Sequence, residues 1–137
     1  MIKWLAERRL VPLIVGGPAD KKQVSEIQAQ CTQRLCLLEQ CHLSQLAWVV
    51  KNAVLYVGHD SGITHLAAAL AVPTVACFGP TDEARWGPRG KSVMIIRGTQ
   101  CQCADWDAVK QCRDKPCLAI SPASLILACE TALKDRN

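Results

Sequence analysis

The sequence predicts an α/β fold, a Rossmann-like parallel sheet of about five strands with helices on both faces. Two observations lead to this prediction. Short apolar, β-branched runs alternate along the chain with segments of helical period, as in a parallel sheet covered by helices. The runs are also almost continuously hydrophobic, which is typical of strands buried on both faces. They are Leu10–Val15, Leu35–Leu38, Val54–Val57, Thr74–Phe78 and Val93–Ile96.

Helices are predicted between these strands from apolar residues at helical spacing. Between the first two runs these residues are Val24, Ile27 and Cys31, and between the next two they are Leu43, Leu46, Ala47 and Val50. Ser44 is the predicted cap of the second of these helices.

Two further helices are predicted from composition and capping residues. The alanine-rich segment Leu66–Ala71 follows the third strand. Near the end of the chain, Ser121 is the expected cap and Pro122 the first helical residue. The final helix is therefore predicted over Ser121–Lys134.

Composition indicates one soluble domain, residues 1–137. The chain has 137 residues, half of them hydrophobic, and a net charge of only +4. This balance excludes an acidic disordered tail and a strongly basic nucleic-acid arm. The longest nearly apolar stretch, Leu66–Phe78, is interrupted by Pro73 and Thr74 and is shorter than the roughly 18 residues of a membrane span. The even charge balance thus predicts no nucleic-acid partner, and the short apolar stretch predicts a soluble chain.

The amino-terminal segment predicts a cytoplasmic location. Residues Met1–Arg9 carry charges where a secretory signal needs an unbroken apolar core. A complete doubly wound enzyme opens with a strand, whereas this chain opens on a charged helical segment. We therefore expect it to be part of a longer protein.

Nine cysteines are an odd number, which argues against an extracellular disulfide framework and for mostly reduced thiols. Five lie in apolar or helical surroundings, where cysteine acts as a small hydrophobe: Cys31, Cys36, Cys41, Cys77 and Cys129. The other four form a cluster: Cys101, Cys103, Cys112 and Cys117. Four thiolates can bind zinc tetrahedrally, but the spacing is irregular. Plain thiols are the alternative, and we assign no metal and no cofactor.

The segment after the third strand carries the chemistry. Gly58–His65 is a tight turn that runs directly into the alanine-rich helix. A helix start has unpaired N–H groups and a partial positive charge, so it can hold a pyrophosphate. Ser61, Gly62, Thr64 and His65 are candidates to converge on that anion. Asp60 ends the strand at the edge where α/β sheets bind ligands, and its carboxylate is suited to sugar hydroxyls. The alternative is an ordinary helix cap.

The motif continues through Val72–Asp82, and the whole segment Asp60–Asp82 closely resembles glycosyltransferase family 9. This family includes the ADP-heptose:lipopolysaccharide heptosyltransferases, and the resemblance extends from Gly16–Asp20 to the final helix. It implies the carboxy-terminal half of a GT-B fold, which binds ADP-heptose or a related nucleotide sugar. The family's amino-terminal domain, which binds the lipopolysaccharide-core acceptor and carries the catalytic carboxylate, is expected to be absent here. No catalytic residue is therefore assigned, and the full enzyme is expected in the cytoplasm, peripheral to the inner membrane.

By position, the resemblance implies that Asp60 contacts the sugar, that Ser61 and Gly62 contact the diphosphate, and that His65 lies near the donor. Ser61 stands where the family often has threonine, which keeps the hydroxyl.

Two further loops supply candidate residues. Asp20, in the loop Gly16–Lys21, is a candidate for the ribose hydroxyls, with a helix cap as the alternative. In the loop Gly79–Gly90, Thr81, Arg85 or Arg89 can approach the diphosphate, and a solvated loop is the alternative.

Two other functions are compatible with the sequence. One is a different GT-B transferase, or a nucleotide-sugar epimerase, with a UDP or GDP donor. The other is a non-enzymatic nucleotide-binding or zinc-binding module.

Overall fold

The computed structural model describes residues 1–31, 35–100, 103 and 105–134. The chain divides into two compact units, Met1–Leu46 and Ala47–Asn137. The helix α3 (Leu43–Lys51) spans the point where the chain passes from one unit to the other.

The first unit contains two parallel strands with helices before and between them. It comprises α1 (Ile2–Glu7), β1 (Leu13–Val15), the 3-10 turn η1 (Pro18–Asp20), α2 (Lys21–Gln30) and β2 (Cys36–Leu38). β1 and β2 pair in parallel, with Ile14 opposite Leu37. Val24 is the buried residue of α2.

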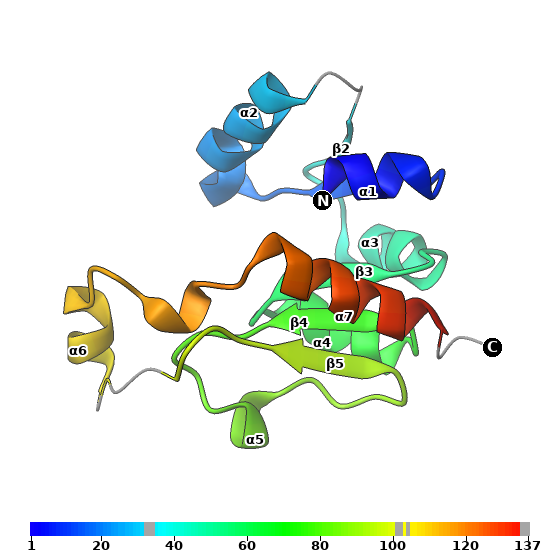
Figure 1. Ribbon diagram of the computed structural model, residues 1–137. Coiled ribbons are helices and arrows are strands. Elements are labelled where there is room, and N and C mark those ends of the chain that lie inside the picture. The colour runs from blue at the N-terminus through cyan, green and yellow to red at the C-terminus, as the bar shows by residue number, and fades with distance from the viewer. Residues whose placement is uncertain (32–34, 101–102, 104, 135–137) are drawn as a thin grey trace. The chain divides into compact units, whose positions relative to one another are not determined.

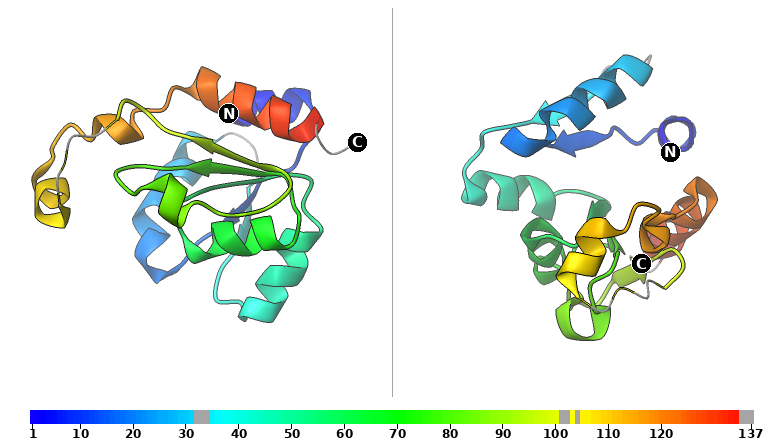
Figure 2. Two further views of the ribbon diagram at one scale, coloured as in Figure 1. Left: turned by 90° about the horizontal axis from the view of Figure 1, so that it is seen from below. Right: turned by 90° about the vertical axis from the view of Figure 1, so that its left-hand side faces the viewer.

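The second unit is an α/β layer structure around three parallel strands. Its elements are β3 (Tyr56–His59), α4 (Gly62–Ala69), β4 (Thr74–Cys77), α5 (Glu83–Trp86), β5 (Val93–Ile96), α6 (Trp106–Gln111), the 3-10 turn η2 (Pro116–Leu118) and α7 (Pro122–Lys134). The strand order is β3-β4-β5. α4 packs on β3 and β4, α7 packs on β4 and β5, and the two helices cover opposite faces of the sheet (Figures 1 and 2).

The core of this unit lies on both sides of the central strand. Val75 and Ala76 are neighbours in β4, and both are completely buried. Because successive strand residues point to opposite faces, their joint burial requires cover on both sides. Ala67 and Ala68 of α4 are buried, as is Cys129 of α7. Small side chains on α4 allow the helix to lie close to the sheet.

The predicted α/β class, the parallel pairing and the helices on both faces are confirmed, and each of the five predicted strands is present. One expectation differs: the described strands pair as two sheets, of two and three strands, instead of one. β1 and β2 are only three residues long, and strands this short offer few ladder hydrogen bonds.

The capping predictions had different outcomes. The amide of Ser124 donates to Ser121 Oγ over 3.0 Å, and α7 begins at Pro122 as predicted. The prediction for Ser44 was wrong, because α3 already begins at Leu43. In that turn Gln45 Oε1 accepts from the amide of His42 instead. Among the described residues, no helix is long and apolar enough to cross a membrane.

Candidate functional site

The loops that follow β3, β4 and β5 leave the sheet at the same edge. His59, Cys77 and Ile96, the last residues of the three strands, lie side by side in the ladder. The segments that follow are Asp60–Ser61, Phe78–Thr81 and Arg97–Gln100. This is the carboxyl edge, where open α/β sheets bind ligands.

The start of α4 is open. Ser61 is its N-cap, with extended backbone (φ −157°, ψ 160°), and its side chain makes no capping hydrogen bond. Within the described chain, the amides of Gly62 and Ile63 donate to no acceptor. Gly62 is exposed, and a Cβ built on it would have no neighbour within 4 Å. Two donor groups at the positive end of an eight-residue helix therefore face free space.

The two hydroxyls near this helix start differ in accessibility. Thr64 is completely buried, and its hydroxyl donates to the carbonyl of His59. Thr64 Oγ1 also lies 3.2 Å from Ser61 Oγ and 3.4 Å from the Tyr56 hydroxyl. Ser61 is only half-buried. Thr64 thus ties the turn to the end of β3, and Ser61 offers the accessible oxygen.

His65 and Asp60 lie on either side of this turn. His65 is exposed. Its amide donates to the carbonyl of Ser61 over 3.4 Å, so His65 is part of the first turn of α4. Asp60 is half-buried at the end of β3. Its carbonyl accepts from His59 Nδ1 over 3.2 Å. Five predicted residues therefore lie at this turn: Asp60, Ser61, Gly62 and His65 are at least partly exposed, and Thr64 is buried.

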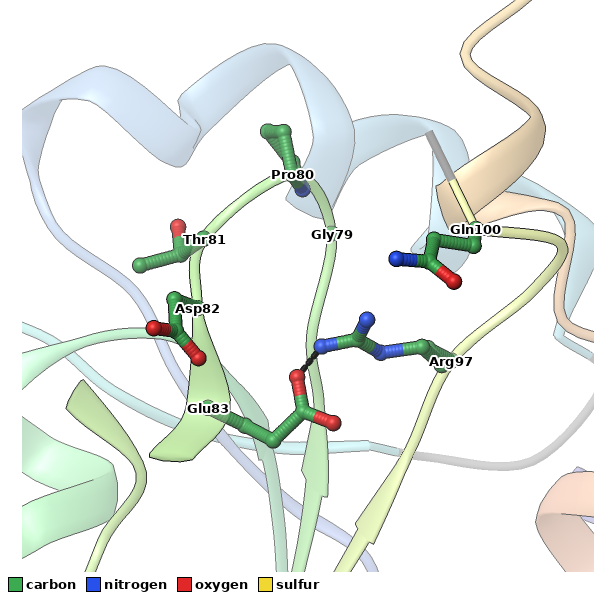
Figure 3. Close-up of a pocket in the computed structure, with 7 residues that line it drawn as sticks. All are labelled: Gly79, Pro80, Thr81, Asp82, Glu83, Arg97 and Gln100. Atoms are coloured by element: carbon green, nitrogen blue, oxygen red, sulfur yellow. Dashed lines mark ion pairs between the residues drawn. The ribbon is translucent and has the colours of Figure 1, made fainter. Parts of the chain in front are cut away.

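A cavity of about 370 Å³ lies at the same edge, next to the loop after β4. It is lined by Gly79, Pro80, Thr81, Asp82, Glu83, Arg97 and Gln100. Arg97 reaches from the end of β5 to form an ion pair with Glu83, while the turn that contains Pro80 arches over one side of the pair (Figure 3). Asp82 caps α5 by accepting from the amide of Ala84 over 3.0 Å.

Of the predicted residues, Thr81 lines this cavity, whereas Arg85 and Arg89 do not. Both arginines are exposed, and the Arg85 guanidinium lies 5.2 Å from the ring centroid of Trp86. Glu83, Arg97 and Gln100 were not among the residues predicted from the sequence. A signal for Arg97 was present, because this residue directly follows a predicted strand, as Asp60 does.

Asp20 has a local structural contact in the first unit. Its carboxylate Oδ2 accepts from the amide of Gly17 over 2.8 Å, which closes the turn η1 between β1 and α2. Asp20 is also the N-cap residue of α2, but its side chain makes no capping hydrogen bond to that helix.

Two cysteines of the second unit, Cys77 and Cys129, are packing groups. Cys129 is completely buried, and burial, together with the nearby Cys77 and Glu130, raises the pKa of its thiol to about 11. Burial also raises the pKa of Cys77. Both thiols are therefore neutral near pH 7, as expected of small hydrophobes.

The zinc hypothesis involves a residue outside the described part of the chain, Cys101. Cys103 and Cys112 are half-buried and Cys117 is buried. In the described residues, no group of three or more His, Cys, Asp or Glu side chains is arranged to hold a metal ion.

Comparison with known proteins identifies close relatives by sequence. Lipopolysaccharide heptosyltransferase 1 of Pseudomonas aeruginosa is 34% identical over 89 residues, which cover 65% of this chain and 24% of the relative. Lipopolysaccharide heptosyltransferase 1 of Escherichia coli O18:K1:H7 is 32% identical over 98 residues, or 70% of this chain and 30% of the relative. The chain thus spans less than a third of these proteins.

Solved structures show the same fold. The glycosyl transferase family 9 protein from Veillonella parvula DSM 2008 superposes with a TM-score of 0.84 at 23% identity, over 96% of this chain and 39% of that one. The E. coli heptosyltransferase WaaC with ADP gives a TM-score of 0.64 at 28% identity, over 80% of this chain and 35% of that one.

The family model described as glycosyltransferase family 9 (heptosyltransferase) matches residues 1–118 of the 137. The match includes the turn at Asp60–Gly62 and the loop that contains Arg97. The chain therefore belongs to glycosyltransferase family 9, the heptosyltransferase family.

Proposed function

We propose that this chain, residues 1–137, is the donor-binding domain of a heptosyltransferase and that it binds the diphosphate of ADP-heptose at the start of α4. The observation that carries this proposal is the pair of free amides at Gly62 and Ile63, which face open space at the carboxyl edge of the sheet. A similar structure, WaaC, is an ADP complex. Family membership and an open anion site thus support the same ligand.

The chemistry of the helix start suits a diphosphate. The macrodipole is equivalent to about half a positive charge at a helix N-terminus. Backbone amides fixed in this position need no rearrangement to stabilise negative charge. In the reaction, the sugar–phosphate bond breaks and charge develops on the departing ADP, so the same amides stabilise the transition state. Ser61 Oγ lies 3.2 Å from Thr64 Oγ1 in the free chain, and its hydroxyl can rotate to donate to a phosphate oxygen as a third donor.

The remaining site residues receive proposed roles from their positions. Asp60 accepts hydrogen bonds from the sugar, and His65 donates a hydrogen bond to the bound ADP-heptose from the exposed face of α4. Thr64 has no direct contact with the ligand, because its hydroxyl is buried. It holds the turn in place and so positions Ser61. Thr81 lies beside the donor in the neighbouring cavity. For Asp20, which is in the first unit, the role at the ribose is proposed from family membership alone, and in the structure its carboxylate closes the turn η1.

The rest of the reaction is assigned to other parts of the enzyme. Since the chain spans only 24% and 30% of the two relatives, we propose that a separate amino-terminal domain binds the lipopolysaccharide-core acceptor and supplies the catalytic base. We also propose that the full enzyme works in the cytoplasm, peripheral to the inner membrane.

Calorimetric titration of the 137-residue chain tests this proposal. ADP is compared with adenosine, which lacks the phosphates, and with UDP and GDP, which keep the diphosphate on another base. We expect ADP to bind, adenosine to bind far more weakly, and UDP and GDP to be intermediate. Equal affinity for ADP and adenosine would refute a diphosphate site, and a preference for UDP or GDP would refute the ADP-linked donor.

A further inference from the structure

The cavity lined by Thr81, Asp82, Glu83, Arg97 and Gln100, here called the Arg97 pocket, differs in chemistry from the helix start. Its volume of about 370 Å³ is near the lower end of the roughly 300–1,000 Å³ that is usual for small-molecule sites. It therefore has room for one group of a nucleotide sugar and not for the whole molecule.

The charges of the Arg97 pocket disfavour a phosphate. Among the described residues that line it, Arg97 is the one cation, and Asp82 and Glu83 are two carboxylates. Glu83 already forms an ion pair with Arg97, so a phosphate would meet a net negative lining. Uncharged hydroxyl groups avoid this repulsion and can use both the carboxylate acceptors and the guanidinium donors.

Donors and acceptors in the Arg97 pocket are available to such a ligand. The Nε of Arg97 is buried and has no hydrogen-bond partner among the described residues, so a buried donor is left to be satisfied. Gln100 is exposed at the rim and carries both a donor and an acceptor. In Figure 3 the guanidinium of Arg97 lies between the carboxylate of Glu83 and the amide of Gln100.

The topology places the Arg97 pocket at a distance from the diphosphate site that a sugar attached to the diphosphate can span. α4 starts at the end of β3, and Arg97 follows β5, with β4 between them. Neighbouring strands lie about 4.8 Å apart, so the two sites are roughly 10 Å apart along the edge. A ligand whose diphosphate lies on Gly62 can extend its sugar ring over β4 toward Arg97.

We infer that the Arg97 pocket binds the polyhydroxylated sugar of the donor and that Glu83, Arg97 and Gln100 determine its specificity. Glu83 accepts from the sugar hydroxyls, while Arg97 and Gln100 donate to sugar oxygens. This inference rests on the proposed diphosphate site, and Asp60 contacts the same sugar from the β3 side.

Titrations with ADP and ADP-heptose test the inference on Glu83→Gln and Gln100→Ala. Each change removes a hydrogen bond to the sugar and none to the diphosphate. We expect the Kd for ADP-heptose to rise about tenfold and the Kd for ADP to stay within about twofold of wild type. Arg85→Gln is the matched control, because Arg85 is exposed on α5 and does not line the cavity; this variant should bind both ligands normally.

The outcomes separate this inference from the proposed function. If both variants bind ADP-heptose like wild type, or lose ADP and ADP-heptose equally, the sugar assignment is overturned and the diphosphate site stands. If wild type binds no ADP, both proposals fall. Should thermal unfolding show that Glu83→Gln is misfolded, Gln100→Ala decides alone, because its exposed side chain at the rim has little part in packing.

Discussion

Gly62→Val changes the ligand site while leaving the fold almost untouched. A Cβ on Gly62 would have no neighbour within 4 Å, and the residue has no positive φ, so the valine fits without strain in the free protein. Exposed substitutions of this kind change the free energy of unfolding by about 0.5 kcal/mol or less. The isopropyl group would instead occupy the space in front of the amides of Gly62 and Ile63.

The expected loss of affinity follows from one blocked hydrogen bond. A hydrogen bond to a charged group is worth about 1.5–3 kcal/mol, and each 1.4 kcal/mol is about tenfold in Kd. Gly62→Val should therefore bind ADP about 10- to 100-fold more weakly than wild type. Calorimetry with ADP measures this loss, and thermal unfolding checks that the midpoint is preserved.

A second glycine provides the structural contrast. A Cβ on Gly90 would lie 2.8 Å from the carbonyl oxygen of Ala68. Gly90→Ala should therefore lower the unfolding midpoint without a specific effect on the binding of the phosphates. Unchanged ADP affinity in a folded Gly62→Val protein would refute the reasoning about the helix start. An equal loss of adenosine and ADP affinity would show that the valine does not act at the phosphates.

Three further predictions concern the sugar, the end of α4 and the buried thiol. Asp60→Ala should weaken ADP-heptose about tenfold or more while changing ADP little, because a carboxylate acceptor to the sugar is lost; equal losses in calorimetry would remove its sugar role. Ala71→Gly should stabilise the chain by about 1 kcal/mol in urea unfolding, because Ala71 has a φ of 58° that only glycine adopts without cost; a destabilised variant would contradict this. Burial raises the pKa of Cys129 from 9.0 to about 11, so the folded chain holds its proton more tightly than the unfolded chain does. The stability that this thiol contributes is thus complete below pH 9 and is lost as pH rises from about 9 to 11. Cys129→Ala should flatten that fall in urea midpoints, and an identical pH dependence in the variant would refute the assignment.

The turn before α4 could be predicted because its signals are local. An apolar run, a glycine-containing turn and an alanine-rich segment follow one another within Val54–Ala71. The strand boundary was less accurate: the predicted run was Val54–Val57, and β3 is Tyr56–His59. The pairing of Tyr56 with Thr74 sets this start, and no sequence pattern near Val54 contains information about the partner strand.

The burial of Thr64 was likewise not predicted. Thr64 and Ser61 both carry hydroxyls in one turn, and their sequence positions do not distinguish an exposed donor from a buried one. Packing of α4 on β3 places Thr64 beneath the turn, where its hydroxyl donates a hydrogen bond to the His59 carbonyl. The accessible donor is therefore Ser61.

The Arg97 pocket depends on contacts between residues far apart in the chain. Glu83 follows β4, whereas Arg97 follows β5, and they meet because the two strands are neighbours in the sheet. The rule that residues after parallel strands gather at one edge was applied to Asp60 and Thr81. The same rule also places Arg97 at this edge, but its meeting with Glu83 depends on the order of the strands, which the structure supplied.

The central claim, that the start of α4 receives the donor diphosphate, is tested most directly by ¹H–¹⁵N spectra of the chain during an ADP titration. The account predicts that the amide resonances of Gly62 and Ile63 move most, because phosphate oxygens accept from those two N–H groups. The claim would be contradicted if ADP at saturation left both resonances in place while amides elsewhere in the chain moved.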